Sequence, residues 1–376
     1  MKKSIYLFNK KISIVQALIF VIAIGVCFFS VIAGTHLSIG ECSMAAIIAS
    51  YPLDQIVKST QYGNTGTHQY RVIPNRIIGA ILVPYNFSVS AANLLPSAFL
   101  AYLQAQSKVA DPTARIYPIY RLTLEKDDTK ETTFADMGYE VQQPVIEGKP
   151  TFSFRILNAD VEMNASLRLF NTLNGSNLMT RVIFIDSNQV LLGTNAGTAG
   201  TFTGFAMTSI QFEPYKINDG KTPTTFRMKI ALEDPKDMND NLHFVQMTVN
   251  VESNVLGCIN AIMTNLTPAV PVSHEVTITG MTNQGAINLF TAYSTLLATK
   301  TLWSFTDSVT GADVSADVTS VTANATLGGW DVLFTMTMTN PVNIALKDPT
   351  TLATAHIGEA PSNPIDGTVP IAVTVT

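Results

Sequence analysis

Short runs in which apolar and polar residues alternate recur along most of this chain, and turn-forming residues separate them. Clear examples are Thr151–Leu157 (TFSFRIL) and Thr224–Leu232 (TTFRMKIAL). A period of two is the spacing of a strand that buries one face. Further strand-like runs lie at 70–89, 115–124, 202–215 and 242–251. The chain is therefore predicted to be mainly β.

Residues 181–192 carry the clearest local signal. Two apolar runs, Arg181–Ile185 and Gln189–Leu192, flank the polar triplet Asp186–Asn188, which predicts a β-hairpin. Two short helices are expected, one starting near Asn93, with Pro96 in its first turn, and ending near Ser107, the other over 161–173 with Asp160 as its cap. The first should bury Leu95, Phe99 and Leu103, with Leu100 as a further candidate on the same face. The second should bury Met163, Leu167, Phe170 and Leu173. The body is thus expected to be a β-rich α+β domain.

Several connections are predicted as irregular. Charged loops are expected over 126–136 and 233–241, a flexible glycine-rich loop over 193–200, and a short helix over 254–264 that carries Cys258. The segment Leu266–Pro271 holds two prolines and is the expected domain boundary.

Beyond this boundary the composition shifts. Residues 272–376 contain Lys300 and Lys347 as their basic side chains and are rich in Thr, Val and Ala. Strand-like runs occur at 274–280, 299–306, 317–323, 330–338 and 368–375. About 100 residues with several short strands favour an immunoglobulin-like β-sandwich, with Trp303 or Trp330 in its core and without the cysteine pair of antibody domains.

The N-terminus has membrane-type character. Residues 12–33 form an almost unbroken apolar run after four lysines, and 22 helical residues span about 33 Å. Three interpretations stay open: a secretory signal cleaved after Ala33, an uncleaved anchor, or a coding sequence that starts at Met44. The expected division is a hydrophobic leader at 1–43, a β-rich structural domain at 44–265 and the sandwich at 272–376.

Composition and motifs argue against several function classes. Charged residues make up 14% of the chain and the net charge is −5, which does not suit a nucleic-acid binder. The sequence has no nucleophile elbow, dinucleotide fingerprint or P-loop. Beyond the leader, neither the histidines, nor the acidic residues of 233–241, nor the single cysteine has a catalytic or metal-ligand spacing. These residues are His68, His243, His274, His356, Glu233, Asp234, Asp237, Asp240 and Cys258. We therefore predict no enzyme activity, no catalytic residue, no cofactor and no metal ligand.

Two aromatic clusters leave alternatives open. Tyr62–Tyr70 (YGNTGTHQY) and Tyr117–Tyr120 (YPIY) have the ring content to stack on sugar faces, or to line a core or a subunit interface. A glycan-binding module or hydrolase is therefore a third function class. A hydrolase would need paired carboxylates in a cleft, and no such pair has a recognisable spacing.

The order of several segments resembles virion structural proteins of phages and prophages of Bacteroidetes, particularly tail-tube-like proteins. The similarity covers roughly residues 70–262, and the segments are Thr113–Tyr120, Val182–Gln189 followed by Gly193-Thr194, Phe202–Phe205, Lys216–Gly220 and Ile230–Lys236 with Asn239. The resemblance implies a non-enzymatic β protein that assembles in many copies, and it transfers no site residues.

Two functions are therefore expected to compete. The first is a self-assembling phage or prophage virion subunit, tail-tube-like or tail-associated, made in the host cytoplasm, with copies of itself and other virion subunits as partners. Its C-terminal domain would be an outward decoration that meets a cell-surface glycan or receptor. The second is an exported or membrane-anchored protein of the cell envelope with an adhesin-like C-terminal domain, which requires retention of residues 12–33.

Overall fold

The architecture is that of a computed structural model, which describes part of the chain. The described residues are 76–129, 133–136, 142–146, 148–157, 167–168, 180–195, 201–214, 216–217, 220, 224–239, 241–267, 274–282, 287–335, 340–359 and 363–375. Outside them lie the leader 1–43, the Tyr62–Tyr70 cluster with His68, residues 268–271 of the predicted boundary, and the predicted helix 161–173 except for the helical residues 167–168. None of the described helices is long and apolar enough to cross a membrane.

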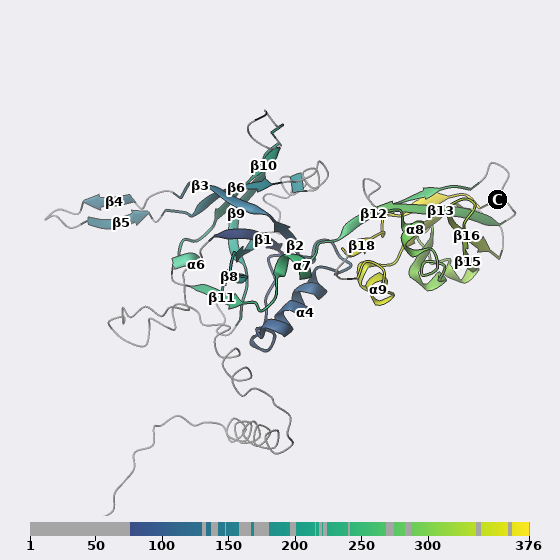
Figure 1. The fold of residues 1–376 in the computed structure, drawn as a ribbon, viewed down its shortest axis with the longest axis horizontal. Helices are drawn as coiled ribbons and strands as arrows, with labels where there is room; N and C mark the ends of the chain where they lie inside the picture. The colour runs from purple at the N-terminus through teal and green to yellow at the C-terminus, as the bar shows by residue number, and fades with distance from the viewer. Residues whose placement is uncertain are drawn as a thin grey trace, which may run out of the picture. The chain divides into compact units, whose positions relative to one another are not determined.

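The described chain is mainly β, as predicted (Figure 1). Its first part, residues 76–255, is called the body. The strands of the body are β1 (Ile77–Val83), β2 (Tyr117–Tyr120), β3 (Leu122–Asp127), β4 (Thr133–Asp136), β5 (Gln142–Ile146), β6 (Thr151–Leu157), β7 (Arg181–Asp186), β8 (Val190–Thr194), β9 (Phe205–Phe212), β10 (Thr225–Leu232) and β11 (Leu242–Gln246). Its helices are η1 (Ala91–Asn93), α4 (Pro96–Gln106), α6 (Lys236–Asn239) and α7 (Val251–Asn254).

Nine of these strands form one antiparallel sheet in the order β11-β8-β7-β9-β10-β6-β3, and β1 joins it by pairing with both β7 and β2. The predicted hairpin is confirmed, because Phe184 and Ile185 of β7 pair with Leu192 and Leu191 of β8. Gln189 closes its turn with a φ of +62°.

The central strands β1 and β7 are buried on both faces. Ala80 and Leu82 of β1 pack into one apolar cluster with the residues of β3, β6, β9 and β10. Ile81 and Val83, which point to the opposite face, pack into a second cluster with α4. This arrangement explains why the sequence of β1 is a continuous apolar run rather than an alternating one.

Helix α4 covers the second cluster. Pro96 occupies its first turn, where a missing N–H costs little, and no side chain caps the helix. Phe99 and Leu103 are buried as predicted, and the Phe99 ring lies edge-on to Phe202 at 5.4 Å. The prediction for Leu95 was wrong: it is 44% exposed, because it precedes the helix in an extended conformation.

The second part, residues 259–375, is called the C-terminal module. Its strands are β12 (Ile259–Asn265), β13 (Glu275–Thr282), β14 (Trp303–Asp307), β15 (Val318–Asn324), β16 (Gly329–Phe334), β17 (Val342–Leu346), β18 (Ile365–Asp366) and β19 (Ile371–Val373). Its helices are α8 (Leu289–Tyr293), η3 (Lys300–Leu302), η4 (Ser315–Asp317) and α9 (Pro349–Thr354).

Two sheets of this module share one core. The five-stranded sheet has the order β15-β16-β13-β12-β18, and the three-stranded sheet has the order β14-β17-β19. Trp330 of the first sheet and Trp303 of the second are both buried, with ring centroids 5.5 Å apart. Their indole nitrogens donate to the carbonyl oxygens of Ser294 and Leu297. The tryptophans therefore fill the space between the sheets while their polar atoms stay hydrogen-bonded.

The predicted helix over 254–264 was wrong. Residues 251–254 form α7, and residues 259–265 form strand β12, which pairs with β13 from Ala261↔Thr282 to Asn265↔Ile278. Alternate burial of Ala261 and Met263 in the C-terminal core overrides the local helical tendency. The second core therefore starts at β12, before the proline-containing segment 266–271.

Other predicted connections contain regular structure. The loop predicted over 126–136 holds the end of β3 and all of β4, and the acidic loop over 233–241 holds α6. The single strand predicted over 115–124 is broken at Arg121, whose φ is +60°. The sequence analysis missed β17, β18, α8 and α9, which are short elements stabilised by packing in the module rather than by a strong local pattern.

The separation of the cores gives a prediction for Phe184, whose ring lies 5.8–5.9 Å from those of Phe152, Phe154 and Phe205. Phe184→Ala should destabilise the body by about 3–5 kcal/mol through the cavity it leaves. Both tryptophans of the chain lie in the C-terminal core. In urea, the far-UV circular dichroism transition should therefore shift to lower concentration, while the tryptophan fluorescence transition should move much less. Leu124→Ala, at a 42% exposed position, is the control, and equal shifts of both signals would contradict separate cores.

Candidate functional site

Strands β3, β6 and β10 present a polar surface opposite their buried side chains. Phe152, Phe154 and Met228 point into the body core, and the side chains between them point away from it. We call this surface the charged face; it consists of Glu125, Asp128, Ser153, Arg155, Arg227 and Lys229.

Two arginines stand directly opposite each other on the charged face. Arg155 of β6 and Arg227 of β10 are register partners, a placement in which like charges repel. Glu125 lies where the register of β3 shifts against β6, and it neutralises the pair. Its carboxylate accepts from Nε and Nη2 of Arg227 and from Nη2 of Arg155, each at 2.6 Å. The hydrogen bonds from Arg227, with those from Arg155, lower the pKa of Glu125 to about 2.

A second carboxylate, that of Asp128, interacts with the next outward-facing side chains of the same strands. Asp128 accepts a hydrogen bond from Ser153 Oγ at 3.0 Å, forms an ion pair with Lys126, and lies 3.9 Å from Lys229 Nζ. Lys229 and Ser153 are register partners. The charged face is thus a ladder of alternating charge, which keeps an open sheet surface soluble and in register.

Beyond the charged face, the chain continues as a separate two-stranded ribbon. β4 and β5 pair with each other, from Thr133↔Ile146 to Asp136↔Gln142, and with no further strand among the described residues (Figure 1). β4 follows β3 along the chain and β5 precedes β6, so the ribbon is a continuation of the β3–β6 strand pair. An isolated two-stranded ribbon is marginally stable in water, and both of its outer edges offer backbone hydrogen-bonding groups. This ribbon is the described segment best suited to gain stability from a partner.

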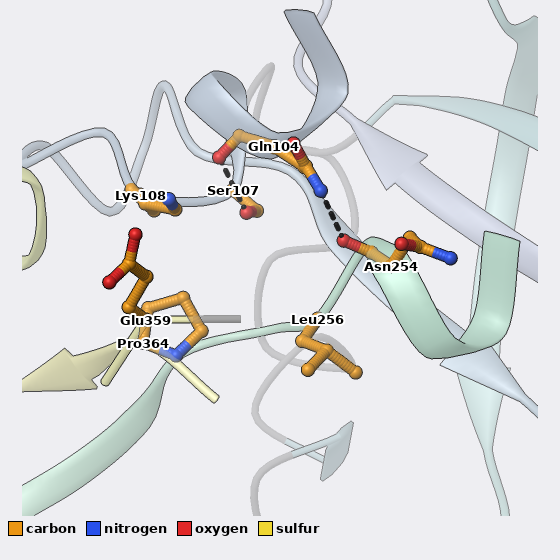
Figure 2. A pocket seen from close by; sticks show the side chains of 7 residues that line it. All are labelled: Gln104, Ser107, Lys108, Asn254, Leu256, Glu359 and Pro364. Carbon is orange, nitrogen blue, oxygen red and sulfur yellow. Dashed lines mark hydrogen bonds between the residues drawn. The ribbon is translucent and has the colours of Figure 1, made fainter. Parts of the chain in front are cut away.

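A small cavity lies where the body meets the C-terminal module (Figure 2). It has a volume of about 150 Å³. The lining residues are Gln104, Ser107, Lys108, Asn254, Leu256, Glu359 and Pro364. Gln104 Nε2 donates to the carbonyl of Asn254 at 2.9 Å, and Ser107 Oγ donates to the carbonyl of Gln104 at 3.0 Å. The lining brings together one cation and one anion, with no nucleophile beside a general base.

The histidines of the described chain lie apart. His243 is buried in β11, with its ring 5.6 Å from that of Phe202. His274 and His356 occupy turns with φ of +64° and +61°, and His356 Nδ1 lies 2.6 Å from Glu359 Oε2 at the surface. Across the residues that the structure describes, no cluster of three or more His, Cys, Asp or Glu side chains is placed to hold a metal ion.

The acidic segment that contains Glu233, Asp234 and Asp237 is a surface turn leading into α6. Asp234 caps the turn by accepting from the N–H of Lys236. Burial raises the pKa of Asp237, which accepts a hydrogen bond from Thr194 Oγ1 at 3.3 Å. Asp240 lies outside the described residues. Asp234 and Asp237 therefore have separate hydrogen-bond partners rather than one common centre.

The tyrosines of the 117–120 cluster line a protein interior. Tyr117 donates to the carbonyl of Pro112, and Tyr120 donates to the carbonyl of Val255. Burial raises the pKa of Tyr120 far above its ordinary value. Of the alternatives left open for this cluster, these contacts favour packing over stacking against a sugar.

Cys258 donates to the carbonyl of Ser107 at 3.2 Å, and burial raises the pKa of its thiol to about 11.

Sequence reasoning missed the charged face and the pairing of Arg115 with Asp366. Arg155 and Arg227 can be assigned to outward positions from the alternating pattern alone. Their register, and the shift that brings Glu125 between them, cannot be predicted in this way. Arg155 and Arg227 are 72 positions apart, and a strand pairing over that separation has no local sequence pattern.

No protein-family model matches this sequence, and a search of the curated proteins finds no similar sequence.

Glu125→Gln should destabilise the body, since it leaves Arg155 and Arg227 without a shared counter-charge. Because Glu125 is partly exposed, the expected loss at neutral pH is about 1 kcal/mol. The folded-state pKa lies below the ordinary value, so the wild-type contribution is full above about pH 4.5 and is lost as the pH falls towards 2. The variant's urea midpoint should depend less on pH in this window. Glu213→Gln, which removes a carboxylate 3.9 Å from Arg227, is the matched control and should have the smaller effect.

Proposed function

We propose that this protein is a structural subunit of a phage or prophage particle, tail-tube-like or tail-associated, that assembles with copies of itself and with other virion subunits. The observation that carries the proposal is the β4–β5 ribbon. Its two strands have no third strand among the described residues, and its outer edges are those of an unfinished sheet. A neighbouring subunit would complete the sheet by β-augmentation, in which backbone hydrogen bonds supply the affinity.

The chemistry of the described body supports a structural role. Glu125 neutralises Arg155 and Arg227, and Tyr117 and Tyr120 donate to backbone carbonyls. Cys258, which follows the body, also donates to a backbone carbonyl. The sequence resemblance to virion proteins covers the same part of the chain. In this proposal the particle is assembled in the host cytoplasm, and the protein performs no bond-making chemistry.

We propose further that the C-terminal module is an immunoglobulin-like sandwich that decorates the particle and contacts a glycan or receptor. The order of its strands supports this assignment. β15-β16-β13-β12 and β14-β17-β19 correspond to the D-E-B-A and C-F-G sheets of the seven-stranded constant type. Trp303 is buried on β14, which corresponds to strand C, where such domains place their core tryptophan. The short strand β18 is an addition, and it pairs in parallel with β12.

The assembly proposal predicts that protein expressed from Met44 forms rings or tubes, visible by negative-stain electron microscopy and by sedimentation velocity. Replacing residues 130–148 by Asn-Gly, which closes β3 and β6 with a tight turn, should leave a folded monomer. Val309→Ser changes a 71% exposed side chain in the C-terminal module and should assemble like the wild type. The proposal fails if the wild type stays monomeric at high concentration and under crowding, or if the shortened variant assembles equally well.

A second candidate, an exported or membrane-anchored surface protein with an adhesin-like C-terminal domain, rests on the apolar run 12–33. It predicts that the native product fractionates with membranes. Protease added to intact cells should then cleave within residues 272–376. N-terminal mass analysis separates retention of Met1, cleavage after Ala33 and initiation at Met44. A product that begins at Met44 and stays in the cytosol would contradict this candidate.

A further inference from the structure

The body and the C-terminal module have separate apolar cores. Val255 is the last body residue in the clusters described above, and Ala261 is the first residue of the C-terminal core. Among the described residues, no apolar cluster contains members from both sides. The chain crosses between the cores once, through Leu256–Cys258, which have no regular secondary structure. A junction of this kind depends on polar contacts and permits relative motion.

One buried ion pair spans the junction. Arg115 and Asp366 are 251 positions apart, and Arg115 Nη1 lies 2.8 Å from Asp366 Oδ2. Their side chains are only 4% and 9% exposed. Such a pair is costly to bury, and removing one partner leaves an uncompensated charge. Although it is a single ion pair, its location between the body and the C-terminal module makes it important for holding the two together.

Each member of the pair is also held by its own side of the junction. Arg115 Nε donates to the carbonyl of Val109 at 2.8 Å, within the loop that follows α4. Asp366 Oδ1 accepts from the hydroxyl of Thr368 at 2.6 Å, within the C-terminal module. The bond between Nη1 and Oδ2 is therefore the contact through which these two groups join the two sides.

Among the described residues, side-chain hydrogen bonds supply further contacts at the junction. Thr350 Oγ1 donates to the carbonyl of Lys108, and Asn363 Nδ2 donates to the carbonyl of Gly257, both at 2.9 Å. The cavity in Figure 2 lies beside these contacts, so the two surfaces do not fill the space between them. Apolar packing of the kind that fixes two domains rigidly is not found among these contacts.

We propose that residues 256–258 are a hinge and that Arg115 and Asp366 form a latch that holds the C-terminal module closed against the body. Opening the latch swings the module about the hinge without unfolding either core. This device is independent of the assembly function proposed above, because it concerns contacts within one chain.

Cys258 lies in the hinge and reports its state. In the closed form the thiol donates to the carbonyl of Ser107 and is half-buried, which slows alkylation. The experiment treats the full chain with iodoacetamide and follows the peptide that contains Cys258 by mass spectrometry, so that Cys27 and Cys42 do not contribute. Arg115→Met should raise the labelling rate of Cys258 roughly a hundredfold, since it breaks a buried pair. Asp366→Asn, which keeps the shape of the side chain, should raise it in the same direction.

Glu125→Gln is the matched control, because it breaks an ion pair inside the body and should leave the labelling rate of Cys258 unchanged. Hydrogen exchange of amides in β7 and β16 tests whether the cores stay folded. Faster labelling with unchanged protection in both strands is the expected result. Unchanged labelling in both latch variants would overturn the proposal. Faster labelling with equal loss of protection in both cores would also overturn it, because the pair would then only stabilise the whole fold.

Discussion

Burial of β1 and β7 on both faces is the constraint on which the rest of the body depends. Each strand sends alternate side chains into two different apolar clusters, so neither can slip by one residue without exchanging the two sets. This fixes the register of the strands beside them, including β9, which pairs with β7 at one end and with β10 along the rest. Because β10 pairs with β9 and β6 pairs with β10, the residues of β6 and β10 that point outward are fixed as well. The charged face therefore depends on the buried packing of β1 and β7.

Most of the β character of this chain could be predicted from its sequence, and the reasons are local. Thr151–Leu157, Thr225–Leu232 and the hairpin of β7 and β8 alternate or turn within a few residues, so the pattern suffices. The strand β12 could not be predicted in the same way. Its alternation is short, and what selects a strand over a helix is the pairing with β13.

The polar surfaces follow the same division between local and distant information. Asp234 and its turn depend on near neighbours, and the sequence indicated a solvated segment there. Glu125 acquires its partners from β6 and β10, and Arg115 acquires Asp366 from the far end of the chain. A chain with 14% charged residues uses several of them in such long-range pairs. Their roles become visible only once the strands are placed.

The parallel pairing of β12 with β18 has a consequence for synthesis on the ribosome. β12 leaves the exit tunnel soon after the body is complete, but β18, its partner at one edge, is made about a hundred residues later. The body can therefore close its own sheet during translation, whereas Ile259 and Asn260 of β12 wait for Ile365 and Asp366 of β18. Over that interval these two residues lack their strand partner, and a chain that terminates before β18 would not gain it.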